Sequence, residues 1–87
     1  MNSMFFNAEI FNQDISTWNT GNVRNMSLMF FRADSFNQDL NQWDVSQVEN
    51  MSRTFKEAGS FNGNISSWNV ENVTNMTEMF EDAFSFN

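Results

Sequence analysis

The apolar positions of the chain recur at a fixed spacing of 25 residues. The recurring aromatic residues are Phe11, Phe36, Phe61, Phe86, Trp18, Trp43 and Trp68. Polar residues vary between the copies, so that one shared position carries Arg24, Glu49 and Thr74. Because the fixed positions are mostly large and apolar and the mixed positions mostly polar, the pattern separates an interior face from an outward face.

This period predicts one domain of about three and a half repeats over residues 1–87, without a linker. Whole repeats span 11–35, 36–60 and 61–85, and partial repeats span 1–10 and 86–87. A unit of this length cannot bury its own apolar side, whereas stacked units cover one another. The sequence therefore predicts a repeat solenoid.

One half of each repeat has the spacing of a short amphipathic helix. Met26, Met29, Phe30 and Ala33 lie at i, i+3, i+4 and i+7, and Asn25 precedes them as a suitable N-cap. The predicted helices lie near 26–33, 51–58 and 76–83, with a partial helix near 1–8.

The other half of the repeat, "FNQDISTW" at 11–18, reads as a strand or extended segment with a bend. Phe11, Ile15 and Trp18 are expected to be buried, although their spacing of 4 and then 3 residues is not a strict alternation. The predicted fold class is an α/β repeat solenoid with one short strand and one short helix in each 25-residue repeat.

Composition excludes several classes of function. The 87 residues contain no Cys and no His, so the chain lacks thiolate ligands and the usual general base. Its net charge of −7 disfavours binding to nucleic acid and to anionic membranes. We expect no enzymatic activity, no cofactor and no membrane insertion by this segment. The start of the sequence lacks signal-peptide features, which leaves a cytoplasmic chain or a piece of a longer one as alternatives.

The copies "FNQDISTWNTGNVRNMSLMFFRA", "FNQDLNQWDVSQVENMSRTFKEA" and "FNGNISSWNVENVTNMTEMFEDA" share more than ten fixed positions. This pattern resembles the repeat of BspA-like leucine-rich-repeat proteins of bacterial surfaces and of repeat-bearing mycoplasma lipoproteins. The resemblance implies a leucine-rich-repeat-like fold, a cell-surface or secreted location within a longer parent chain, adhesion or host-protein binding, and no catalysis. Thr54 and the pair Gly63–Asn64 depart from the pattern, which we interpret as local softening.

The repeated "FNQD" segment brings oxygen-bearing side chains together and raises the question of calcium. The residues concerned are Asn12, Asp14, Asn37, Asp39, Asn62 and Asn64. Calcium takes six to eight oxygen ligands, but Asn and Asp also commonly bond backbone groups at turns. The spacing matches no EF-hand loop, so we favour the backbone role and predict no metal site.

We expect the outward residues of the "FNQD" half to contact a ligand. These are Gln13, Asp14, Ser16, Gln38, Asp39, Asn41, Asn64 and Ser66. Phe31 and Phe84 are further candidates, since they stand where most other copies carry polar residues or Gly.

Two functions remain. The first is a non-enzymatic surface interaction or adhesion module that binds a protein or host ligand through its outward face. The second is a structural array that assembles by end-to-end stacking, since the chain shows no polar capping units at its ends. A contiguous patch of non-repeating residues favours the first, and a mass that changes with concentration favours the second.

Overall fold

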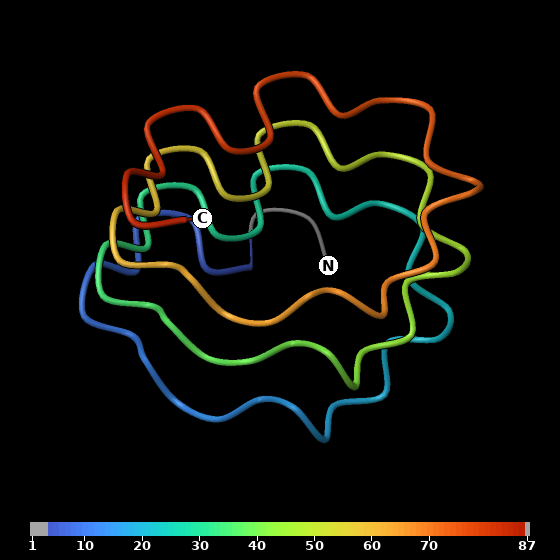
Figure 1. Ribbon diagram of the computed structural model, residues 1–87, viewed down its shortest axis with the longest axis horizontal. Helices are drawn as coiled ribbons and strands as arrows, with labels where there is room; N and C mark the ends of the chain where they lie inside the picture. Colours follow the sequence, from blue (N-terminus) through green and yellow to red (C-terminus); the bar gives the residue numbers. More distant parts are fainter. Residues whose placement is uncertain (1–3, 87) are drawn as a thin grey trace.

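The computed structural model describes residues 4–86, and the chain winds in successive coils that lie on top of one another (Figure 1). We call residues 11–35, 36–60 and 61–85 the first, second and third coils. Parallel bridges join Asn25 to Asn50 and Asn50 to Asn75, which places equivalent residues side by side. The body measures 28 × 26 × 23 Å.

The predicted α/β, leucine-rich-repeat-like solenoid is wrong. Residues 4–86 contain no helix, and their only strand pairing is the isolated bridging at Asn25, Asn50 and Asn75. The ranges 26–33, 51–58 and 76–83 consist mainly of turns. The described part of the range near 1–8 is also without a helix, and residues 1–3 lie outside the described residues. The molecule is a compact body built from turns and extended stretches.

Backbone hydrogen bonding explains why no helix forms at 26–33. Alternate N–H groups leave the coil: Met26 donates to the carbonyl of Asn50 at 2.9 Å and Leu28 to that of Ser52 at 3.1 Å. The N–H of Met29 instead closes a turn onto the carbonyl of Met26 at 3.2 Å. A helix needs every N–H to donate to the carbonyl four residues earlier. The bonds between coils replace that pattern.

The backbone dihedrals show the same departure from a helix. Leu28 and Arg32 have φ values of 59° and 57°, in the left-handed region. The same two positions have positive φ in the later coils, at Arg53, Glu57, Glu78 and Asp82. A positive φ at the third residue of a turn is the mark of type II geometry, and it interrupts a right-handed helix. The sequence pattern therefore identified the buried face correctly, but that face belongs to consecutive tight turns.

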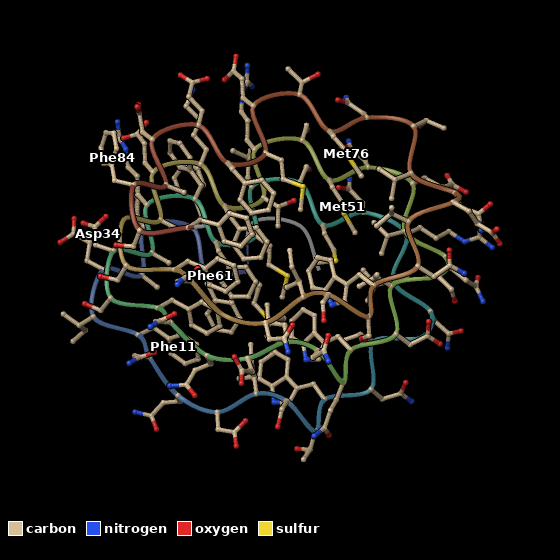
Figure 2. All side chains as sticks on the ribbon, in the orientation of Figure 1. Phe11, Asp34, Met51, Phe61, Met76 and Phe84 are labelled. Atoms are coloured by element: carbon tan, nitrogen blue, oxygen red, sulfur yellow. The ribbon has the colours of Figure 1, made fainter. Side chains whose placement is uncertain are left out.

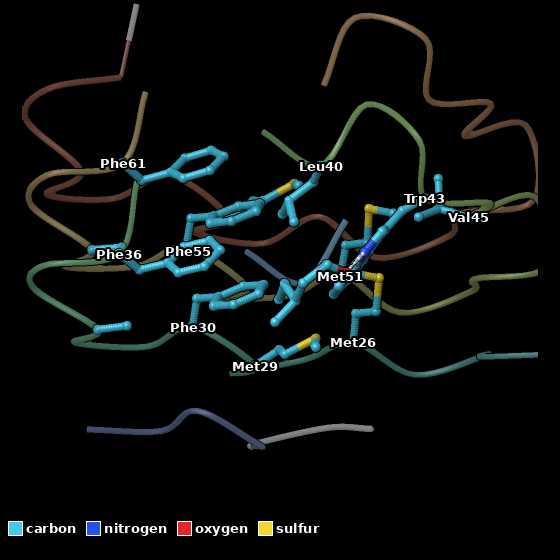
Figure 3. Packing of buried hydrophobic residues seen from close by; sticks show 14 of the residues in the cluster. Met26, Met29, Phe30, Phe36, Leu40, Trp43, Val45, Met51, Phe55 and Phe61 are labelled. Atoms are coloured by element: carbon cyan, nitrogen blue, oxygen red, sulfur yellow. Dashed lines mark hydrogen bonds between the residues drawn. The ribbon is translucent and has the colours of Figure 1, made fainter. Parts of the chain in front are cut away.

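Columns of stacked aromatic rings fill the centre of the molecule (Figure 3). The rings of Phe30 and Phe55 are 5.3 Å apart and nearly parallel, at 3°. Phe36 and Phe61 form a second column at 6.0 Å. Parallel rings at these separations bury large apolar areas, so the columns contribute to the hydrophobic stabilisation of the core together with its buried Met, Leu, Ile and Val side chains.

The predicted strand at 11–18 is also absent, and its expected burial holds only in part. Ile15 is buried, whereas Trp18 is 38% exposed and contacts Phe5 at a ring distance of 5.7 Å. Trp43, at the equivalent position in the second coil, is 4% exposed. Its indole N–H donates to the Ile15 carbonyl at 2.9 Å, and Trp68 bonds the Leu40 carbonyl in the same way at 2.8 Å. Trp43 and Trp68 are therefore each anchored by the coil before them.

Asparagine side chains bond the backbone, as their positions at turns in the sequence predict. The Asn12 Oδ1 accepts from the N–H of Asn37 at 2.8 Å, and the Asn37 Oδ1 accepts from that of Asn62 at 2.7 Å. The Asn25 Oδ1 accepts from the N–H of Ser27 at 2.9 Å, which closes a turn of the kind that Asn forms locally. The predicted N-cap role of Asn25 is therefore wrong, because no helix follows it and its side chain closes an Asx turn instead.

Candidate functional site

A groove lined by polar side chains crosses all three coils on the "FNQD" side. It has a volume of about 420 Å³. We call it the polar groove, and its lining residues are Asp14, Ser16, Gln38, Asp39, Asn41, Gln42 and Asn64. Six of the eight residues expected on this face line it together. Gln13 and Ser66 line neighbouring hollows instead.

Gln42 lines the polar groove as well, and the sequence pattern did not predict it as a contact residue. Its counterparts, Thr17 and Ser67, are also polar, so this position is uniformly hydrophilic across the coils. A position that is polar in every coil indicates an outward-facing side chain, and this would have identified Gln42. Gln42 is exposed and makes no side-chain hydrogen bond within the described residues, so its amide is free to contact a ligand.

Hydrogen bonds to the backbone hold the side chains of the polar groove in place. The Asp39 Oδ1 accepts from the N–H of Asn64 at 2.8 Å, and the Asn41 Oδ1 accepts from that of Ser67 at 2.8 Å. The bond from the Ser16 backbone N–H lowers the pKa of Asp14. The polar groove therefore offers carboxyl and amide groups that hydrogen bonds hold in place, which suits a ligand rich in hydrogen-bond donors or positive charge.

A second groove, of about 530 Å³, runs along one edge of the stack. We call it the acidic groove, and its lining residues are Glu9, Arg32, Asp34, Glu57, Gly59, Asp82 and Phe84. Phe84 is 85% exposed, and Figure 2 shows it on the same side of the molecule as Asp34.

Phe31 does not join Phe84 in this groove. Its ring is half-buried and packs on Phe6, with centroids 4.9 Å apart. The guanidinium of Arg32 lies 5.0 Å from the Phe31 ring centroid. The structure therefore separates the two aromatic candidates: Phe31 is half-buried against Phe6, and Phe84 is exposed.

Ion pairs connect each coil to the next. Arg24 pairs with Glu49 at 3.2 Å, and Arg32 pairs with Glu57 at 3.0 Å. Between the second and third coils, Glu78 accepts from Lys56 at 2.7 Å and from Arg53 at 3.0 Å.

The convergence of two cations on one carboxylate has an electrostatic consequence. The hydrogen bonds from Lys56 and Arg53 lower the pKa of Glu78 from 4.5 to about 2. The bond to Glu78 also raises the pKa of Lys56. These groups lie outside both grooves, and their role is to hold the second and third coils together.

Among residues 4–86, no group of three or more His, Cys, Asp and Glu side chains is arranged to hold a metal ion. The described part of the chain also has no helix with the length and apolar character needed to cross a bilayer.

The comparisons with known proteins identify a family. A family model described as "Mycoplasma protein of unknown function, DUF285" matches residues 1–87. Neither the curated proteins nor the solved structures contain a match. The match over the whole sequence shows that the chain belongs to the DUF285 family.

Proposed function

We propose that the protein is a non-enzymatic interaction module of the BspA-like kind, which acts at a cell surface or after secretion and binds a protein or host ligand. The observation that carries the proposal is the polar groove, where six residues at predicted outward positions of the repeat line one concave site. Membership of a mycoplasma family is compatible with such a setting.

The polar groove supports binding and offers little for catalysis. It contains carboxylates, amides and one hydroxyl, with no imidazole, thiol or amine. Its carboxylates accept backbone hydrogen bonds, so they are fixed hydrogen-bond acceptors. Because the residues come from three successive coils, an extended ligand would contact each coil in turn, and several weak contacts would add up to useful affinity.

An adhesion assay tests this proposal. Beads that carry the protein are applied to cultured mammalian cells and to a panel of immobilised extracellular-matrix proteins, and bound beads are counted. We expect retention above that of albumin-coated beads, and Gln42→Arg should reduce it by filling the polar groove. Gln47→Arg is the matched control, because Gln47 is exposed in the same coil but does not line the groove. Equal retention by both variants, or none by the wild type, would contradict the proposal.

A structural array is the second candidate, and exposed apolar side chains on the outer coils favour it. Met4 and Phe6 are exposed on one side of the stack, and Val70 and Met76 on the other. The net charge of −7 opposes association of identical chains. Light scattering over a range of concentrations and salt separates the two candidates, because only an array gains mass as concentration rises.

A further inference from the structure

We propose that the acidic groove is a second docking site, for a basic segment of another protein. The segment would place Lys or Arg side chains beside Glu9, Asp34 and Asp82, and an apolar side chain against Phe84. This site shares no residue with the polar groove, so the inference goes beyond the proposed function.

The charges of the acidic groove are mostly uncompensated. Its single cation, Arg32, is already engaged, with Glu57 at 3.0 Å and with the ring of Phe31 at 5.0 Å. Within residues 4–86, the carboxylates of Glu9, Asp34 and Asp82 have no hydrogen-bond or ion-pair partner. Three free carboxylates along one hollow attract a cation and repel an anion.

Phe84 adds an apolar contact beside these charges. It is 85% exposed, and it makes no ring contact within the described residues. The equivalent positions hold Glu9, Asp34 and Gly59, so the aromatic ring is specific to the third coil. A Cβ atom built on Gly59 would meet nothing within 4 Å, which leaves open space in the second coil at this position. An exposed aromatic residue in a hollow is a typical anchor for a partner protein.

A neighbouring hollow extends this surface in the other direction along the stack. It shares Glu9 with the acidic groove and contains Ile10, which is 91% exposed. The equivalents of Ile10 are Ser35, Ser60 and Ser85, so this apolar residue also departs from the repeat. Exposed apolar residues that break the repeat therefore flank the carboxylates on both sides, which fits a segment that alternates basic and apolar side chains.

Charge also decides which partner fits. A second copy of this chain is unsuitable, because all four of its basic side chains are engaged in ion pairs. Nucleic acid and anionic lipid would meet three free carboxylates in the acidic groove. A basic polypeptide segment meets opposite charge along its length and still reaches Phe84.

Fluorescence anisotropy with a labelled octapeptide of alternating Lys and Leu tests the site. The wild-type protein should bind this peptide, and should not bind the peptide with Glu in place of Lys. Phe84→Ser should weaken binding about tenfold, through loss of the aromatic anchor. Asp34→Asn should weaken it about threefold, as expected for one exposed charge. Because both positions are exposed, both variants should keep the near-ultraviolet circular dichroism of the Trp residues. If one variant loses this signal, Asp82→Asn is tested in its place.

Glu71→Gln is the matched control, since it removes one exposed negative charge outside both grooves. We expect binding by this variant to stay within about twofold of the wild type, because distant charges are screened. Three results would each overturn the proposal: no binding of the basic peptide by the wild type, equal losses in Asp34→Asn and Glu71→Gln, or unchanged binding in Phe84→Ser.

Discussion

The indole N–H of Trp43 donates a 2.9 Å hydrogen bond to the backbone carbonyl of Ile15, which lies 28 residues earlier in the preceding coil. Both side chains are almost fully buried. The bond is drawn as a dashed line in Figure 3, beside the buried Met residues. One side chain thus joins two coils through both its apolar ring and its polar atom.

We expect Trp43→Phe to lower the free energy of unfolding by about 1–3 kcal/mol, because the substitution removes the hydrogen bond and leaves the Ile15 carbonyl in a dry site. Urea unfolding followed by circular dichroism measures this change. Trp18→Phe is the control, since Trp18 is 38% exposed and its indole makes no hydrogen bond within the described residues. Equal losses in the two variants would show that ring size, and not the bond, is responsible.

Removal of a buried ring of the central column should lower the free energy of unfolding far more than removal of an exposed ring. Phe55 is fully buried and stacks on Phe30, Phe61 and Phe80. We expect Phe55→Ala to lower the free energy of unfolding by about 3–5 kcal/mol. Phe84→Ala, at the exposed position, should change it by less than about 0.5 kcal/mol. A small loss of stability in Phe55→Ala would contradict the tight packing of Phe55 within the stacked column.

Glu78 should make stability depend on acidity. Its pKa is lowered to about 2 in the folded protein, against an ordinary value of 4.5. A lowered carboxyl pKa stabilises the folded state above the unfolded value, and that stabilisation is lost as the pH falls through the folded value. The contribution of Glu78 is therefore complete above about pH 4.5 and disappears on the way down to about pH 2.

Melting temperatures of wild type and Glu78→Gln at pH 7 and pH 2 measure this effect. The variant should melt at a lower temperature at pH 7, and the difference should shrink at pH 2, where about half of the Glu78 carboxyls are protonated in the folded wild type. High salt should also shrink it. Glu71→Gln serves as the control, because the Glu71 side chain has no ion pair within the described residues. A constant difference at both pH values would rule out the electrostatic origin.

At Leu28, where the backbone is left-handed, substitution by Val and by Gly should have opposite effects on the free energy of unfolding. Leu28 has φ at 59°, which costs a residue with a Cβ about 1–2 kcal/mol and costs glycine nothing. We expect Leu28→Val to lower the free energy of unfolding by about 1 kcal/mol, because β-branched residues tolerate this region least. Leu28→Gly should match or exceed the stability of the wild type. Urea unfolding of the pair is the measurement, and a Val variant as stable as the Gly variant would contradict the backbone assignment.

Gly63 approaches its neighbours closely and should not tolerate a side chain. A Cβ at this position would contact the Gln38 carbonyl oxygen and lie 2.9 Å from a ring carbon of Phe61. We expect Gly63→Ala to lower the free energy of unfolding by about 1–3 kcal/mol, the usual cost of overpacking. Gly59→Ala is the control, because a Cβ there meets nothing within 4 Å. Thermal unfolding compares the two, and equal stability of both variants would contradict the close approach.

The sequence predicted the inward residues of the turn segment better than it predicted secondary structure. Met26, Met29, Phe30 and Ala33 are all buried, as their spacing indicates. The same spacing wrongly predicts a helix, because consecutive tight turns and a helical turn both return to one face after three or four residues. What separates them is the positive φ at Leu28 and Arg32, and neither residue type favours that region in isolation. Bonds to the next coil impose it.

The candidate site was predicted in outline. Outward polar positions such as Gln38 and Asp39 do meet in one groove, because equivalent residues of successive coils lie side by side. The sequence pattern does not predict the acidic groove, although it does indicate Phe84 as a candidate contact residue. The groove depends on the concave shape of the edge formed by Asp34, Gly59 and Phe84, and the order of residues along the sequence does not reveal that shape.

The bridges that join Asn25 to Asn50 and Asn50 to Asn75 give every coil the same neighbour relations. Genetic duplication or deletion of one whole 25-residue segment would leave those relations intact, because each kind of contact between coils repeats every 25 residues along the sequence. Loss of a single residue would instead misalign everything downstream of it. Evolution can therefore lengthen or shorten such a chain in whole 25-residue units, whereas the insertion or deletion of one or two residues inside a unit should be selected against.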